Sequence, residues 1–497
     1  MSAPRTDYDR VPYPAGVFDH THPSRLATLA TLFGMRPAPV ERCRVLELGC
    51  SRGNNLIPMA EALPASSFVG IDLAELPIAE GQAFAAGRGL ENIRLAQQDI
   101  LDFEVEPGAY DYIIAHGVYS WVPPAVQEKV LAIFERGLAP QGVGYLSYNA
   151  LPGGHLRRML RDLMRYHTRD IEASADRMKQ ARAIAAFVAA GSPAQSGLYK
   201  DVMTWQRERL EKLSDEYLFH DDMAEHNEAL YFHELVARAG RHGLAYLADA
   251  CFADMQIQRY APDVRAVLGK IDDLVSREQY LDFVGGRAFR RSLLVRGDVA
   301  LDRRLDGRRV RGFFFASRAA PRAEQLDLTG EAVVRFENSA GVVVGLGSPL
   351  AKAAMTALHE AAPAALSFEE LGAAAKAKLG QDASPLSPAE EDELGELILA
   401  MYGGDMIELY SHRPRAVRRA GEKPLAWALS RAQAALGSEV TTLLHGNVRL
   451  DDPANRRLLT LLDGTRDRGA LARSMADGRS DLEARLAKLG EFGLLES

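Results

Sequence analysis

Residues Val45–Asn55 read VLELGCSRGNN, which is an apolar run, a glycine-containing turn and the polar start of a helix. Short apolar runs follow at intervals (SFVGID, IRLAQQD, YDYIIAHG and GVGYLSYN), and amphipathic segments lie between them at Asn54–Ala62, Ile78–Gly87 and Pro124–Gly137. Such runs alternating with helices are typical of βαβ units in a mainly parallel sheet. The sequence from Arg44 to Asn149 therefore predicts an α/β domain.

The composition indicates a soluble protein of several domains. A chain of 497 residues with 47% hydrophobic and 25% charged residues corresponds to roughly three domains. A net charge of -8 gives no general attraction to nucleic acid or anionic membrane. The three cysteines form no CxxC pair, and the start MSAPRTDYDR has no apolar core, so neither a cysteine-based zinc site nor a signal peptide is expected. We expect a cytoplasmic protein.

The pattern of apolar and charged residues changes after the PGG at Pro152–Gly154. Helical patterns rich in charge follow, with one strand-like run, SLLVRG, at Ser292. From about Leu326, two β-like runs precede three helical segments and the short run MIELYSH, an order that resembles a winged helix. We therefore expect an α/β domain at 1–165, a mostly helical domain at 166–325 and a winged-helix-like domain at 326–497.

Three acidic residues stand at the ends of predicted strands. Glu47 precedes the glycine turn, Asp72 ends FVGID, and Asp99 follows the next strand. The turn lacks the G-x-G-x-x-G of dinucleotide sites, and a carboxylate at its mouth would repel a pyrophosphate. S-adenosylmethionine instead offers an ammonium group for Glu47, a ribose diol for Asp72 and an adenine amine for Asp99. The alternative is an α/β sheet in which these acids are incidental.

The wider sequence resembles a known family. The segments CRVLELGCSRGNNLIPMAEALPASSFVGIDL, YDYIIAHGVYSWVP, LSYNALPGG, EYLFHDDMAEHNEALYFHEL and NRRLLTLLDGTRDRGAL are similar to class I S-adenosylmethionine-dependent methyltransferases with a methyltransferase regulatory domain, and more narrowly to rickettsial-type protein-lysine methyltransferases. The one departure is Ser51, where general class I enzymes often have glycine.

The resemblance implies a Rossmann-like sheet with an antiparallel last strand, a regulatory domain, a winged-helix-like C-terminal domain, methyl transfer to lysine side chains, and dimers. The cofactor it implies is S-adenosyl-L-methionine. The residues expected to bind that cofactor are Tyr13, Glu47, Gly49, Cys50, Gly53, Asn54, Asn55, Asp72, Leu73, Asp99, Ile100 and His116.

Five residues after the fourth and fifth strands are candidates for catalysis: His116, Tyr119, Trp121, Tyr148 and Asn149. Aromatic rings can hold an incoming cation, and a tyrosine or amide can orient the neutral amine. For the three aromatic residues the alternative is core packing. His116 either lies near the cofactor or acts as a base, and Asn149 either contacts the acceptor nitrogen or shapes a turn.

Two further segments have competing interpretations. The arm that carries Tyr13 and Phe18 either folds over the cofactor as a lid or packs outside the sheet. The histidines and aspartates of His220–His233 lack the H-E-x-x-H spacing, so we expect a helix and no metal. Between Leu350 and His412, eleven acidic residues stand against three lysines, which is the wrong sign for DNA phosphates.

The leading hypothesis is a methyltransferase for protein lysines that binds neither nucleic acid nor membrane. A methyltransferase for a small molecule or another side chain, and a protein that senses the cofactor without catalysis, are the alternatives. A chain ending near Asp170 is expected to keep cofactor binding and lose protein methylation.

Overall fold

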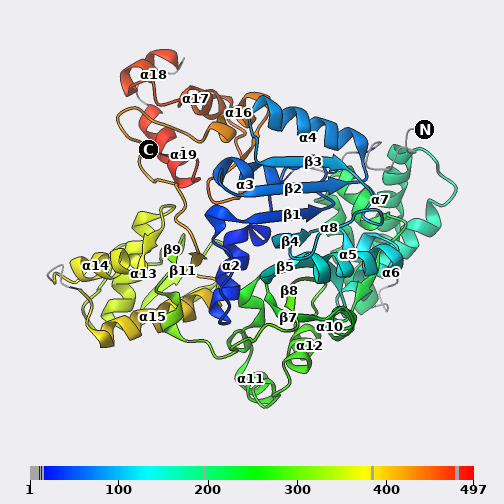
Figure 1. The fold of residues 1–497 in the computed structure, drawn as a ribbon, viewed down its shortest axis with the longest axis horizontal. Coiled ribbons are helices and arrows are strands. Elements are labelled where there is room, and N and C mark those ends of the chain that lie inside the picture. Colours follow the sequence, from blue (N-terminus) through cyan, green and yellow to red (C-terminus); the bar gives the residue numbers. More distant parts are fainter. Residues whose placement is uncertain are drawn as a thin grey trace.

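The computed structural model describes residues 11, 13, 16–191, 193, 197–381, 385–475 and 481–496. Its centre is a sheet with the strand order β3-β2-β1-β4-β5-β8-β7, and β6 also pairs with β5 (Figure 1). The strands are β1 (Arg44–Leu48), β2 (Ser67–Asp72), β3 (Ile93–Gln97), β4 (Tyr110–Ala115), β5 (Leu138–Ala150), β6 (Ala229–Leu230), β7 (Leu244–Asp249) and β8 (Phe289–Arg296). Strands β1 to β6 pair in parallel, whereas β8 is antiparallel to both β5 and β7. The expected α/β class is confirmed.

Helices cover both faces of the sheet, as the near-continuous apolar strands require. One face packs on α2 (Pro23–Leu32), α3 (Leu56–Ala62) and α4 (Glu75–Gly87). The other packs on α5 (Pro124–Gly137) and α10 (Phe232–Arg241). Because side chains alternate along a strand, every second residue of β1, β4 and β5 points to the same helical layer.

The expected boundary at residue 165 does not coincide with the edge of the sheet. Strand β8 contains the predicted run SLLVRG and lies beside β5, and β7 pairs with β8. Both strands come from the segment expected to be a separate helical domain. Because β5 would otherwise present an unpaired, apolar edge, a chain ending near Asp170 would lack part of its central sheet.

The helical insertion has its own small core. Helices α6 (Gly154–His167), α7 (Ser174–Gly191) and α8 (Leu198–Glu211) pack around one apolar cluster. The chain then returns to the sheet through α9 (Asp215–Tyr217) and a π-helical turn, η5 (Leu218–Asp222). Helices α11 (Pro262–Leu268) and α12 (Leu274–Gly285) precede β8. In the part of the chain that the structure describes, no helix is both long and apolar enough to span a bilayer.

The third part of the chain joins the core of the sheet. Helices α13 (Pro349–Ala361), α14 (Phe368–Lys378) and α15 (Pro388–Gly403) share one buried apolar cluster with α2, α3 and β1. Side-chain caps from Ser348, Ser367 and Ser387 begin these helices. The strands of this part are β9 (Phe314–Ala316), β10 (Ala320–Pro321), β11 (Val334–Glu337), β12 (Val343–Leu346), β13 (Leu366–Ser367) and β14 (Glu408–Tyr410).

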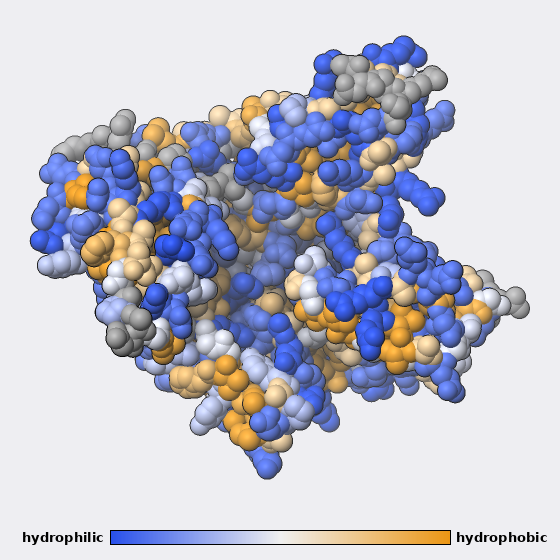
Figure 2. Space-filling view, turned by 180° about the vertical axis from the view of Figure 1, so that it is seen from behind, coloured by the Kyte–Doolittle hydropathy of each residue, from blue (hydrophilic) through white to orange (hydrophobic). Residues whose placement is uncertain are grey.

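The C-terminal elements form a further unit with a separate core. They are α16 (Ala428–Leu436), β15 (Glu439–Thr441), β16 (Asn447–Arg449), α17 (Pro453–Leu461), α18 (Arg468–Ser474) and α19 (Leu482–Glu491). Seen from behind, the molecule has a deep central hollow whose walls are mostly hydrophilic (Figure 2). A polar hollow between domains is a usual place for a ligand or substrate site.

Candidate functional site

The loop after β1 has the backbone that its glycines predict. Gly49 and Gly53 each have a φ of +72°, and Ser51 is also left-handed, with a φ of 49°. A Cβ on Gly49 would lie 2.5 Å from a methyl carbon of Val118, so only glycine fits there. The left-handed Ser51 explains why glycine suits this position in other class I enzymes.

Glu47 is buried with half of its carboxylate unpaired. The side chain is 4% exposed, and Oε1 accepts a hydrogen bond of 2.8 Å from the Asn55 amide. Among the described residues, Oε2 has no hydrogen-bond partner. Burial, together with the charge of Asp72, raises the pKa of Glu47 to about 8. A buried oxygen of this kind calls for a donor, and an ammonium group would supply one.

The other two acids lie at the same edge of the sheet. Asp72 accepts hydrogen bonds from the backbone N–H of Ser51 (2.8 Å) and of Ala74 (2.9 Å). Asp99 accepts one from Leu101, in the loop that follows β3. The predicted neighbours Leu73, which is 49% exposed, and Ile100 stand beside these acids. This edge therefore presents carboxylates and apolar side chains together, as a nucleoside requires.

Asn55 contacts the site by a hydrogen bond to the Glu47 carboxylate. Its amide group donates to Glu47 and to the Thr21 hydroxyl (2.9 Å), and its oxygen accepts from the backbone N–H of Phe18 (3.1 Å). His445, 390 positions away in the chain, lies 2.9 Å from the same oxygen through Nε2. The residue was expected to bind the cofactor, but its polar atoms are engaged by the protein. Its role is to position the Glu47 carboxylate.

His116 lies beneath the N-terminal arm. The Phe18 ring lies 3.9 Å from the imidazole, centroid to centroid, and the Tyr145 hydroxyl lies 3.1 Å from Nδ1. Burial, with the charge of Arg291, lowers the pKa of His116 to about 3, so the ring is neutral at physiological pH. The arm also reaches Asn447 through the backbone of Val17. The arm therefore covers the imidazole of His116.

The predicted catalytic residues divide between the two faces of the sheet. Asn149 follows Tyr145 by four positions on β5, so it shares the face of His116, and its amide donates to Asn227 at 3.0 Å. Tyr119 and Tyr148 belong to the apolar cluster on the opposite face, where the Tyr148 hydroxyl lies 3.4 Å from Ser292. These two rings pack the core in this structure. Trp121 ends the short helix η3 (Tyr119–Trp121) and is half-buried.

The remaining predicted cofactor residues form the loop itself. Cys50 is buried, and its sulfur would lie 2.7 Å from a Cβ on Gly70, so it packs the loop on β2. Asn54 is half-buried at the start of α3. Gly53 closes the turn, and its N–H donates to the carbonyl of Cys50.

Several residues near the site carry no motif that sequence reasoning can use. Tyr145 is four residues before Asn149, so strand alternation could have identified it. Asp221 and Asn227 lie in the segment judged for metal binding, and Tyr13 donates to Asp221 at 3.3 Å. In the described part of the chain, no group of three or more His, Cys, Asp or Glu side chains could hold a metal. The link from His445 depends on the tertiary fold alone.

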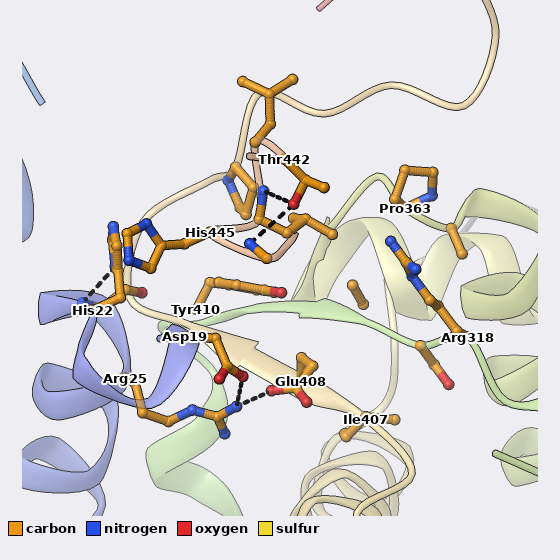
Figure 3. Close-up of a pocket in the computed structure, with 18 of the residues that line it drawn as sticks. Asp19, His22, Arg25, Arg318, Pro363, Ile407, Glu408, Tyr410, Thr442 and His445 are labelled. Carbon is orange, nitrogen blue, oxygen red and sulfur yellow. Dashed lines mark hydrogen bonds and ion pairs between the residues drawn. The ribbon is translucent and has the colours of Figure 1, made fainter. Parts of the chain in front are cut away.

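A cavity of about 350 Å³ lies behind the cofactor loop, where three parts of the chain meet. Arg25 of α2 is paired there with Asp19 and Glu408, and His22 lies beside His445 (Figure 3). Burial lowers the pKa of His445 to about 4. None of the predicted site residues lines this cavity. The residues that line this cavity connect the C-terminal hairpin to α2, and they support the cofactor loop from behind.

The sheet order, the glycine loop and the acids at the ends of β1 and β2 define a class I methyltransferase, and the cofactor is S-adenosylmethionine. Three family models match in sequence order: a methyltransferase domain at 45–142, a "predicted methyltransferase regulatory domain" at 214–296, and a "PKMT, C-terminal winged helix domain" at 422–491. The chain belongs to the family of methyltransferases that combine these domains. The winged helix model thus matches only the residues after 421, whereas the sequence pattern suggested a winged-helix-like domain over 326–497.

Relatives match either nearly all of the chain or about half of it. The protein RP789 of Rickettsia prowazekii (strain Madrid E) is 32% identical over 98% of this chain and 89% of its own length. RP028 of the same organism is 34% identical over 47% of this chain and 94% of its own length. The structure of PKMT2 from Rickettsia typhi in complex with AdoHcy superposes with a TM-score of 0.86 at 26% identity, covering 98% of this chain and all of that one (100%).

Proposed function

We propose that this methyltransferase acts on the side-chain amine of lysine residues in a protein substrate. The observation that carries the proposal is a row of polar side chains along one edge of the sheet. Asp72, Glu47, His116 and Asn149 lie at the carboxyl ends of β2, β1, β4 and β5, which are neighbours in that order. The first two suit the cofactor, and the last two extend beyond it toward an acceptor. The PKMT name of the full-length structural relative supports lysine as that acceptor.

The chain's own residues would hold both reactants. Glu47 and Asp72 would hold the ammonium and ribose groups of the cofactor, which when bound supplies a methyl group on a positively charged sulfur. The Asn149 amide would orient the acceptor nitrogen in line with that group. His116 is neutral and would add no competing positive charge. Phe18 would exclude water, because the arm covers the imidazole.

Amine deprotonation is the chemical requirement that the site must meet. A free lysine amine has a pKa of about 10.4 and carries its lone pair only after it loses a proton. His116 is half-buried and Asn149 is buried, and such surroundings favour the neutral amine because burial disfavours charge. We therefore expect methylation to accelerate with rising pH in the neutral range.

The test is methyl transfer by the full-length protein from cofactor labelled in its methyl group. The acceptors are arrays of synthetic peptides that contain lysine, with matched peptides in which norleucine replaces it. After hydrolysis, label in methylated lysine supports the proposal. Label in another residue, or in small extractable molecules, contradicts it and favours the rival methyltransferase. A protein that binds the cofactor and transfers no label would be a sensor.

A further inference from the structure

Asp221 lies in an unusual turn at the edge of the site. The π-helical turn η5 contains it, and the backbone N–H of Met223 donates to the carbonyl of Leu218, five residues earlier, at 3.0 Å. Turns of this kind are rare and occur frequently at functional sites. The turn leads from the helical insertion back to the sheet. It therefore brings its side chains to the carboxyl end of β5.

Two adjacent acids in this turn have different surroundings. Both oxygens of Asp222 are engaged by the guanidinium group of Arg209, at 2.6 and 3.1 Å. Asp221 accepts one hydrogen bond, from the Tyr13 hydroxyl to Oδ1. Its Oδ2 has no hydrogen-bond or ion-pair partner among the described residues. Asp222 is thus a structural residue, whereas Oδ2 of Asp221 can accept a hydrogen bond from a ligand.

The surroundings of Asp221 suit a cation. The Tyr13 ring lies edge-on to Tyr217 at 5.4 Å and tilted against His220 at 5.6 Å. Aromatic faces and a carboxylate are the groups that bind ammonium. Burial, together with the charge of Asp222, raises the pKa of Asp221 to about 6. The side chain is thus ionised in neutral solution and incompletely solvated.

Hydrogen bonds connect this turn to the predicted reaction site. The backbone carbonyl of Asp221 accepts from the Asn227 amide at 2.9 Å, and Asn149 donates to the oxygen of that amide. Strand β6, which begins two residues later, pairs with β5 at Asn149. Asp221 is therefore linked to the Asn149 side chain through one intervening residue, Asn227. It lies on the side of Asn149 away from the cofactor acids.

We propose that Asp221 receives the ammonium group of the incoming lysine and selects a cationic side chain for the site at Asn149. This inference rests on the proposed function. We assign Asp221 to specificity and not to catalysis. A carboxylate next to the reacting nitrogen would keep the lysine amine protonated and would oppose methyl transfer. The rings of Tyr13 and Tyr217 form the sides of this entry position. Tyr13 belongs to the arm that covers His116, so the arm would contact both cofactor and acceptor.

The experiment compares two fluorescent peptides that differ at one position, lysine or norleucine, in binding to the full-length protein with S-adenosylhomocysteine present. The wild-type protein should prefer the lysine peptide by at least about tenfold, the value of one charge-assisted hydrogen bond. Asp221→Asn should reduce this preference about tenfold and leave the affinity for S-adenosylhomocysteine within threefold. Asp221→Glu keeps the charge and should retain most of the preference.

The matched control is Asp215→Asn, because Asp215 is an exposed acid of the same segment, paired with Arg182. It should behave as the wild type does. A lysine preference that survives in a folded Asp221→Asn protein, judged by its thermal transition, overturns the inference. A wild-type protein that does not prefer lysine overturns the proposed function instead, and the inference with it.

Discussion

Glu47 couples binding of the cofactor to pH. Its pKa is raised to about 8, against an ordinary value of 4.5, so near neutral pH the folded protein without cofactor holds a proton that the unfolded chain has lost. The stability from this proton is complete below pH 4.5 and is lost as the pH rises toward 8. The ammonium group of the cofactor would instead favour the ionised form of Glu47, because it would pair with the carboxylate.

We therefore expect S-adenosylmethionine to bind more tightly as the pH rises from 6 to 7.5. Below the pKa, binding must displace the proton, so affinity should change by up to about tenfold per pH unit. Calorimetric titration in buffers of different ionisation enthalpy should show proton release. Glu47→Gln cannot release a proton, so its weaker affinity should be nearly independent of pH. Equal pH dependence in both proteins would remove Glu47 from the ammonium site.

Residue positions were predictable where they follow from strand ends. Glu47, Asp72 and His116 each stand at the end of a strand with an apolar pattern, and open α/β sheets bind ligands at that edge. The roles of Tyr148 and Asn149 needed the observed faces of β5, because adjacent residues point in opposite directions. Asp221 could not be placed, since a π-helical turn leaves no pattern in the sequence.

At the scale of elements, β8 holds a buried charge network. Arg290 is 1% exposed and pairs with Asp282 (2.8 Å) and Glu278 (3.1 Å). Its guanidinium carbon lies 4.0 Å from the Phe232 ring centroid, so one arginine joins β8 to α12 and α10. Burial raises the pKa of both acids, which makes each dependent on this positive charge.

Arg290→Met should lower the free energy of unfolding by about 3–5 kcal/mol, because it leaves the buried Glu278 carboxylate without its ion pair and leaves Asp282 paired with Arg287 alone. The loss should be smaller at pH 5 than at pH 8, since protonation removes the unpaired charges. Urea unfolding at the two pH values measures both effects. Arg296→Met, at the exposed end of the same strand, is paired with exposed Asp298 and should change stability by less than about 1 kcal/mol. Similar losses for the two variants would contradict the buried network.

Element types were easier to predict than element partners. The run SLLVRG was recognised as a strand because it contains the short apolar stretch Leu293–Val295. Its place beside β5 was not predicted, because roughly 140 residues separate the two strands and no local pattern specifies pairing at that distance. The consequence for experiments is direct: a chain ending near Asp170 should fail to fold.

At the scale of the molecule, the C-terminal hairpin touches the cofactor site. His445 lies in the turn between β15 and β16, with a left-handed φ of 55°, and contacts the same Asn55 that positions Glu47. The winged helix domain therefore contributes to the methyltransferase site through one imidazole. The imidazole at the tip of this hairpin is buried, whereas Asn447 and Arg449 of β16 are exposed.

We expect His445→Asn to weaken S-adenosylmethionine binding about fivefold, because one hydrogen bond contributes about 1 kcal/mol. Asparagine tolerates the left-handed backbone, but its side chain is too short to reach Asn55. Calorimetric titration measures the change. Arg457→Ala, on the exposed side of α17, should bind as the wild type does. Unchanged affinity for His445→Asn would show that the hairpin supports the domain interface only.

The contact between His445 and Asn55 also has a consequence during protein synthesis. A ribosome produces the glycine loop early and the imidazole about 390 residues later. Until the end of translation, the nascent chain holds a loop whose Glu47 lacks its final support and a sheet that waits for β8. Full affinity for the cofactor should therefore arise only after the C-terminal unit has left the ribosome. Chains released after β8 but before His445 should then bind the cell's methyl donor more weakly than the complete chain does.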